Sequence, residues 1–155
     1  MARWSEVEAE APELAKRARE FFDARTHKTL ATLRKDGSPR ISGIEADFRD
    51  GELWFGSMWR AVKALDLQRD PRFAVHSGSA DPAEWKGDAK IAGRVEEITD
   101  PEVIAVINAN APPGESHLFR ADVTEVSVVT IGDPRDHLVI ESWHEGRGVT
   151  SRRRR

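Results

Sequence analysis

A hydroxyl and two cations lie close together in the chain, where a short apolar run gives way to a helical pattern. Gly56 frees the backbone to turn, and Ser57 is a suitable N-cap for a following helix. Arg60 and Lys63 then fall within its first turns, beside unpaired N–H groups and the positive end of the helix dipole. This combination predicts a phosphate cradle. The alternative is that Ser57 only caps the helix and both cations are solvated surface charges.

The segment that carries these residues, 52–75, has the pattern strand, turn, helix and strand. Residues 53–55 form a short apolar run typical of a strand. A helix is expected over 58–67, and it would pack on a sheet through small and apolar side chains. The residues of this expected face are Ala61, Val62, Ala64 and Leu65.

Three antiparallel strands are expected up to this helix, connected by hairpin signals. Strand 29–33 leads through an Asp36–Gly37 turn into strand 40–48, and Asp50–Gly51 then leads into strand 53–55. Within 40–48, one face is expected to carry the residues Ser42, Ile44, Ala46 and Phe48. This order of elements places Arg40 at the start of the second strand.

Four further strands are expected at 73–76, 89–96, 125–131 and 138–143. A helix with Asp100 as its cap and Pro101 as its first residue is expected to stop by 112–114. About seven short strands without β-α-β alternation predict a mainly β protein built as one antiparallel barrel with peripheral helices.

The two ends of the chain differ in character. Apolar residues recur at helical spacing from Trp4 to Phe22, which predicts one amphipathic helix within 1–25 that covers the sheet or packs on another subunit. Residues 149–155 end in four consecutive arginines, Arg152 to Arg155, and are expected to be a disordered basic tail.

Length and composition bound the possible functions. The 155 residues suit a single domain, 1–155, with 39% hydrophobic and 33% charged residues. The absence of cysteine excludes disulfides and a thiol nucleophile and agrees with a cytoplasmic protein. No apolar run approaches membrane-spanning length. The net charge is −3, and it is more negative when the final arginines are left out. An acidic protein body is not typical of nucleic-acid or membrane binding, so neither is an expected partner.

Three stretches, 29–48, 56–75 and 138–148, together resemble the pyridoxamine 5′-phosphate oxidase-like split-barrel family. The resemblance implies an FMN-binding split β-barrel of the mainly β (α+β) class. It also implies a homodimer with the cofactor in a groove between subunits, and FMN, the deazaflavin coenzyme F-420 or a heme-type ligand as cofactor. Arg40, Ser57 and Lys63 match the family's basic residue, hydroxyl and phosphate-binding lysine.

The C-terminal sequence departs from the true pyridoxamine phosphate oxidases. After Trp143 the chain reads HEGRGV, where those enzymes carry an arginine- and histidine-bearing substrate motif. The ending is more similar to flavin or deazaflavin reductases of the same fold. The expected activity is therefore hydride transfer between a bound cofactor and a small organic substrate, with no catalytic side chain required.

The resemblance and the residue chemistry together imply a set of cofactor-binding residues. They are Arg40, Ser42, Ser57, Arg60, Lys63, His76, Ser77 and Trp143. Trp59 and Trp85 are further candidates for walls of a ring pocket, and Lys86 and Arg147 for contacts to a longer anionic tail. No histidine spacing predicts a metal site. The alternatives are a non-catalytic flavin- or heme-binding module and a heme-degrading protein, with His76 or His144 as axial ligand.

Overall fold

The computed structural model describes residues 2–109 and 115–155, which contain four short helices and eight strands. The helices are α1 (Trp4–Glu10), α2 (Pro12–Asp23), α3 (Val62–Arg69) and α4 (Pro101–Ile107). The strands are β1 (His27–Leu33), β2 (Pro39–Arg49), β3 (Glu52–Met58), β4 (Arg72–His76), β5 (Gly87–Ile98), β6 (Ser116–Ile131), β7 (Leu138–His144) and β8 (Gly148–Arg154).

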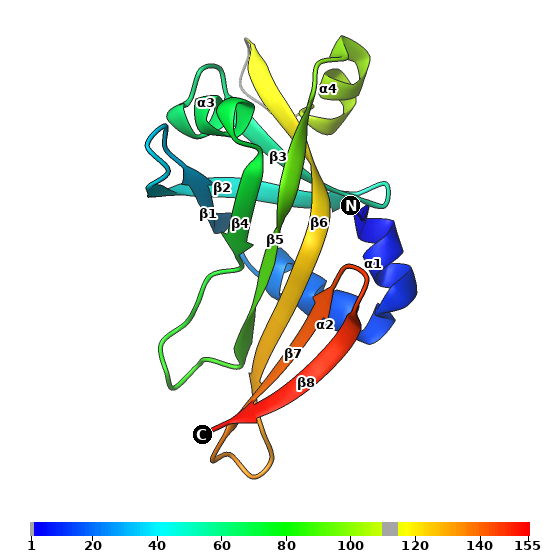
Figure 1. Cartoon of the computed structure of the whole chain (residues 1–155), viewed down its shortest axis with the longest axis vertical. Helices are drawn as coiled ribbons and strands as arrows, with labels where there is room; N and C mark the ends of the chain where they lie inside the picture. Colours follow the sequence, from blue (N-terminus) through cyan, green and yellow to red (C-terminus); the bar gives the residue numbers. More distant parts are fainter. Residues whose placement is uncertain (1, 110–114) are drawn as a thin grey trace.

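The strands form one antiparallel sheet in the order β3-β2-β1-β4-β5-β6-β7-β8 (Figure 1). An additional pairing between β3 and β6 closes the first six strands into a barrel, and β7 and β8 extend from it as a hairpin. Closure is possible because β6 is long: residues 116–120 pair with β3, whereas 125–131 pair with β7. The predicted antiparallel barrel is confirmed.

Strand β5 carries an irregularity that helps the sheet to bend. The register between β5 and β6 shifts between Ala92 and Gly93. A Cβ at Gly93 would lie 2.0 Å from the carbonyl oxygen of Asp122, so only glycine allows this approach.

Strand β2 has the predicted alternation. Ile44, Ala46 and Phe48 are buried, and the residues between them are exposed. At the following turn Asp50 and Gly51 both have positive φ, 54° and 73°, as a two-residue hairpin turn requires.

The N-terminal segment forms two helices where one was predicted. Ala11 leaves the helical region with φ −138° and ψ 64°, and Pro12 starts α2 because it lacks the N–H needed to continue α1. The helices pack on the barrel through an aromatic cluster in which Trp4 and Phe22 contact Phe48, with ring centroids 4.6 and 5.9 Å from it.

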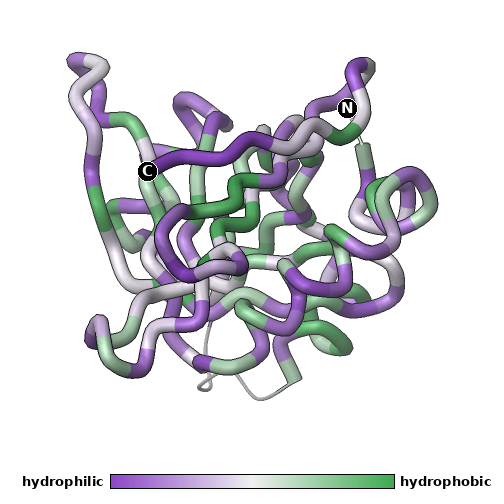
Figure 2. Tube along the Cα trace, turned by 90° about the horizontal axis from the view of Figure 1, so that it is seen from below, coloured by the Kyte–Doolittle hydropathy of each residue, from purple (hydrophilic) through white to green (hydrophobic). Residues whose placement is uncertain are grey.

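The C-terminal segment is a strand, contrary to the disordered tail expected from its charge. Gly148–Arg154 pairs with β7 over seven positions, from His144↔Gly148 to Leu138↔Arg154. Backbone pairing leaves the arginine side chains in solvent, so their charge does not oppose the strand. Figure 2 shows this hydrophilic end on the outside of the molecule.

Helix α4 begins as predicted, with Asp100 accepting a hydrogen bond from the Glu102 amide and Pro101 as the first residue. It ends at Ile107, and the expected stop at 112–114 lies outside the described residues. Within the ranges described, no helix has the length and apolar character needed to cross a membrane.

Candidate functional site

The junction between β3 and α3 differs from the predicted turn and cap. Strand β3 continues through Gly56 to Met58 because these residues pair with β6, and sheet pairing overrides the local turn signal at Gly56. Ser57 is buried in the strand, and its hydroxyl donates to the Met58 carbonyl at 3.2 Å. The N-cap of α3 is Ala61, which has no capping side chain. The prediction that Ser57 caps the helix is therefore wrong.

A histidine that the sequence did not single out holds the connecting turn. Arg60 has a left-handed backbone, with φ 58°, and its amide donates to Nε2 of His117 at 3.0 Å. Because Nε2 accepts, Nδ1 of the neutral ring carries the proton and donates to Glu97 at 2.7 Å. Trp59 stacks on the same ring, with centroids 4.7 Å apart and planes 8° apart. His117 thus fixes the conformation of this turn.

Helix α3 packs on the barrel with a different face from the predicted one. Its buried residues are Ala64, Asp66 and Leu67, whereas Val62 and Leu65 are exposed. The predicted apolar face did not include Asp66, so the sequence pattern gave no signal for this buried carboxylate, and only the structure identifies Asp66 as a candidate site residue.

Asp66 receives three hydrogen bonds below the helix. Its Oδ2 accepts from Thr32 Oγ1 at 2.8 Å and from Arg40 Nε at 2.7 Å, and its Oδ1 accepts from Arg69 at 2.9 Å. Burial opposes ionisation of Asp66, but the hydrogen bonds from Arg40, Arg69 and Thr32 outweigh it and hold the pKa of the carboxyl below its ordinary value. The carboxylate is therefore charged at neutral pH.

Lys63 forms a second link between α3 and β2. Its ammonium donates to the Gly43 carbonyl at 2.7 Å, three residues along β2 from Arg40. Lys63 and Asp66 lie on the same side of α3, one turn apart. The seam between α3 and the start of β2 thus combines three cations, Lys63, Arg40 and Arg69, with the single carboxylate of Asp66.

Hydrogen-bond donors at the seam remain available to bind an anion. Arg40 uses only Nε for Asp66, and across residues 2–109 and 115–155 neither of its terminal nitrogens donates a hydrogen bond. Its side chain remains 25% exposed. Ser42 is half-buried on the same face of β2 as Arg40. A guanidinium fork, an ammonium and the uncapped start of α3 suit a phosphate group.

The other predicted residues lie elsewhere. His76 and Ser77 are at the end of β4 remote from α3 (Figure 1). Nδ1 of His76 accepts from the Gly78 amide, and the Ser77 hydroxyl accepts from the Ala89 amide, so both secure the β4–β5 connection. Trp143 is buried under the N-terminal helices, where its indole N–H donates to Glu10 at 2.9 Å, and it presents no surface to a ligand in this chain.

The remaining candidates are also distant from the seam. Trp85 precedes β5 and donates to Asp88 at 3.3 Å. Lys86 adjoins it, and Arg147 lies in the β7–β8 turn. His144 is on β7, with Nε2 3.7 Å from Glu125. The structure thus brings together Arg40, Ser42 and Lys63, whereas Ser57 lies in the last part of β3 and Arg60 in the turn that follows it.

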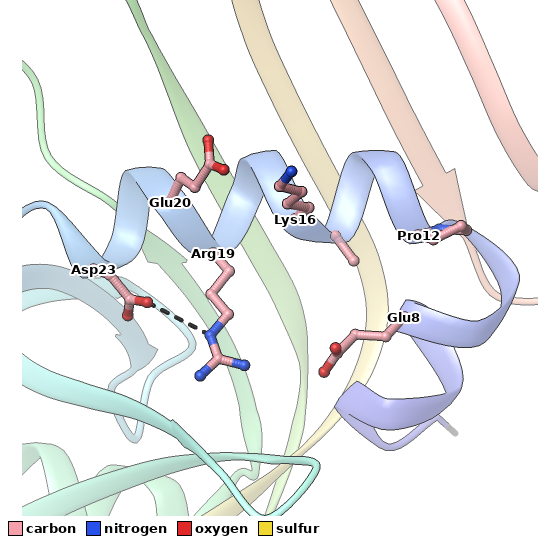
Figure 3. A pocket seen from close by; sticks show the side chains of 7 residues that line it. Glu8, Pro12, Lys16, Arg19, Glu20 and Asp23 are labelled. Carbon is pink, nitrogen blue, oxygen red and sulfur yellow. Dashed lines mark ion pairs between the residues drawn. The ribbon is translucent and has the colours of Figure 1, made fainter.

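The seam is separate from the hollow between the N-terminal helices. That hollow measures about 370 Å³ and is lined by both carboxylates and cations, among them Glu8, Lys16 and Arg19. Figure 3 shows Arg19 paired with Asp23 there, at 3.5 Å. Arg19 is therefore already paired with an acidic neighbour. No group of three or more potential metal ligands occurs in the described parts of the chain.

Comparison with known proteins identifies the fold family. A family model described as pyridoxamine 5′-phosphate oxidase matches residues 14–131. The chain belongs to the pyridoxamine 5′-phosphate oxidase family. The matched range contains Arg40, Lys63 and Asp66, and it ends with β6, before the β7–β8 hairpin. No curated protein sequence matches the chain.

Solved structures share this family fold. A structure of PhzG from Burkholderia lata 383 in complex with tetrahydrophenazine-1-carboxylic acid has a TM-score of 0.64, 15% identity, and coverage of 93% of this chain and 91% of its own. A pyridoxamine 5′-phosphate oxidase-related, FMN-binding protein from Nostoc punctiforme PCC 73102 has a TM-score of 0.61 and 15% identity, with 96% of each chain covered. A structure described as an F420 reductase has a TM-score of 0.55 and 20% identity, over 70% of this chain and 94% of its own. The split-barrel fold implied by the sequence resemblance is confirmed.

Proposed function

We propose that this protein is an oxidoreductase that binds FMN or the deazaflavin F-420 and passes a hydride to or from a small organic substrate. The observation that carries the proposal is the meeting of Lys63 and Arg40 at the α3–β2 seam, inside the family-matched range. Membership of an oxidase family, with FMN-binding and F420 reductase proteins of the same fold, supports a flavin-type cofactor.

The residues present fit the phosphate of such a cofactor. Lys63 offers a compact ammonium at the rim of the seam, and Arg40 offers two terminal nitrogens in a plane. Lys63 lies in the first turn of α3, and the start of this helix has no side-chain cap. Arg60, exposed in the preceding turn, is suited to a longer anionic tail. A bound flavin or deazaflavin would supply the hydride chemistry, whereas these residues bind and orient it.

We also propose that the protein is a homodimer. Support comes from four large apolar side chains that are exposed at the β3–α3 junction: Met58 at 75%, Trp59 at 53%, Val62 at 53% and Leu65 at 39%. Such a concentration of exposed apolar surface is typical of an association site. A cytoplasmic location, inferred from the lack of cysteine, stays a prediction.

Titration of the purified protein with FMN and with F-420 tests the proposed function. Binding is followed by cofactor absorbance and tryptophan fluorescence, in the wild type and in Lys63→Ala. Loss of a hydrogen bond to a charged group costs about 1.5–3 kcal/mol, so we expect about 10- to 150-fold weaker binding. The control is Lys16→Ala, which removes an exposed lysine from the hollow between α1 and α2 and should leave affinity unchanged.

Three results would contradict the proposal in different ways. Unchanged affinity in Lys63→Ala would refute the phosphate assignment. Binding without reduction or oxidation of the cofactor by any donor or acceptor would favour the non-catalytic module. No binding of either flavin, together with a Soret band on addition of hemin, would favour the heme alternative.

A further inference from the structure

The nitrogens of the Arg40 guanidinium are used unequally. Its Nε is bonded to Oδ2 of Asp66 at 2.7 Å, and its terminal nitrogens make no hydrogen bond among the described residues. The Asp66 side chain is only 3% exposed, whereas that of Arg40 is 25% exposed. One edge of the guanidinium is therefore held below α3, and the other edge remains available at the surface.

Asp66 is itself held rigidly. Thr32 donates to the same oxygen that Arg40 uses, and Arg69 donates to the other oxygen. Arg69 in turn donates to the Leu33 carbonyl at 2.7 Å, which ties this end of α3 to β1. Three donors from two strands and the helix leave the carboxylate little freedom to rotate.

We propose that Asp66 is a positioning residue for the cofactor phosphate: it fixes Arg40 through Nε so that the terminal nitrogens are presented to the phosphate. This inference rests on the proposed function and adds to it a residue that does not itself touch the cofactor. A long arginine side chain loses conformational freedom when it binds, and a partner that orders it beforehand removes this cost from the binding step.

The proposal makes a prediction opposite to that of simple electrostatics. Asp66→Asn removes a negative charge close to the phosphate, and Coulomb's law alone predicts tighter binding of the anion. If Asp66 acts by holding Arg40, the same substitution must weaken binding, because a neutral amide holds the guanidinium less strongly than a carboxylate does. Residues that orient metal ligands contribute about 10- to 100-fold to metal affinity, and we expect an effect at the lower end of that range for a residue that orients a phosphate ligand.

The test compares FMN with riboflavin, which lacks the phosphate. For Asp66→Asn we expect FMN to bind about 10-fold more weakly, with riboflavin affinity unchanged. Glu141→Gln is the matched control, because it makes the same carboxylate-to-amide change at a residue that pairs with an arginine, Arg17, but lies on β7, outside the seam. It should leave the ratio of the two affinities unchanged. If the wild type prefers F-420, the same comparison is made between F-420 and its phosphate-free chromophore instead of between FMN and riboflavin.

The outcomes separate this inference from the proposed function. An equal loss for FMN and riboflavin would show a merely structural role, and unchanged or tighter FMN binding would refute positioning. If Lys63→Ala leaves the ratio of FMN affinity to riboflavin affinity unchanged, the assignment of the phosphate site is refuted. If Lys63→Ala lowers the ratio and Asp66→Asn does not, only the inference about Asp66 fails.

A second variant applies if Asp66→Asn does not fold. Arg40→Lys keeps the charge but cannot both bond Asp66 through Nε and present two terminal nitrogens. Selective weakening of FMN binding in this variant supports the proposal, and unchanged binding overturns it.

Discussion

Replacing Asp66 with asparagine should lower the free energy of unfolding as well as affinity. Asparagine keeps the size of the side chain but loses its charge, and it places an amide among three donors, Thr32, Arg40 and Arg69. Removing one partner of a fully buried ion pair costs about 3–5 kcal/mol. Here Arg40 and Arg69 are 25% and 38% exposed and can regain water, so we expect about 2–3 kcal/mol, or about 5–10 °C in Tm for a domain of this size.

The effect of acid gives this prediction a second, independent readout. The folded pKa of Asp66 lies below its ordinary value of 3.8, so the carboxylate stabilises the fold above the unfolded pKa. That stability is lost as the pH falls through the folded pKa. The difference between wild type and Asp66→Asn should therefore be complete at pH 7 and shrink below about pH 4.

Urea unfolding followed by tryptophan fluorescence at pH 7 and at pH 3 measures both quantities. The wild type loses stability in acid for other reasons as well, since a hydrogen bond from Arg17 lowers the pKa of Glu141. This contribution cancels when wild type and Asp66→Asn are compared, because both proteins contain the Arg17–Glu141 pair. A difference below about 1 kcal/mol at pH 7 would refute the reasoning, as would a difference that persists unchanged at pH 3.

Two further predictions concern a buried cation and the exposed apolar surface. Lys28 is 6% exposed, and burial lowers the pKa of its ammonium below the ordinary value of 10.5. Lys28→Met should therefore raise the free energy of unfolding at pH 7 by about 1 kcal/mol. The wild type should become more stable as the pH rises towards 10.5, and the variant should lack this rise. Urea unfolding between pH 7 and pH 10 checks this, and a less stable variant at pH 7 would contradict it. Val62→Asp should weaken the proposed dimer by about 30-fold or more in sedimentation equilibrium. Val149→Asp, at a site 47% exposed on β8, is its control, and a monomeric wild type would contradict the dimer.

Local sequence patterns identified most of the barrel. Alternation in β2, the Asp50–Gly51 turn and the capped start of α4 at Asp100 all depend on residues that are neighbours in the chain. Their conformations follow from side-chain period and backbone preference, which a single segment already contains. The family resemblance then supplied the split barrel and strengthened the assignment of Lys63, which the residue pattern had already indicated.

The sequence by itself did not determine the start of α3 or the partners of its polar residues. Gly56 and Ser57 have the local properties of a turn and a cap, but pairing with β6, about 60 residues later in the chain, keeps both in β3. Asp66 appears as one carboxylate among many until folding brings Thr32 and Arg40 beneath it. Sequence patterns determine which face of an element is apolar, whereas hydrogen bonds between distant strands depend on the closed sheet. The tertiary structure alone therefore decided that Arg40 is anchored and that His76, Ser77 and Trp143 lie away from Lys63.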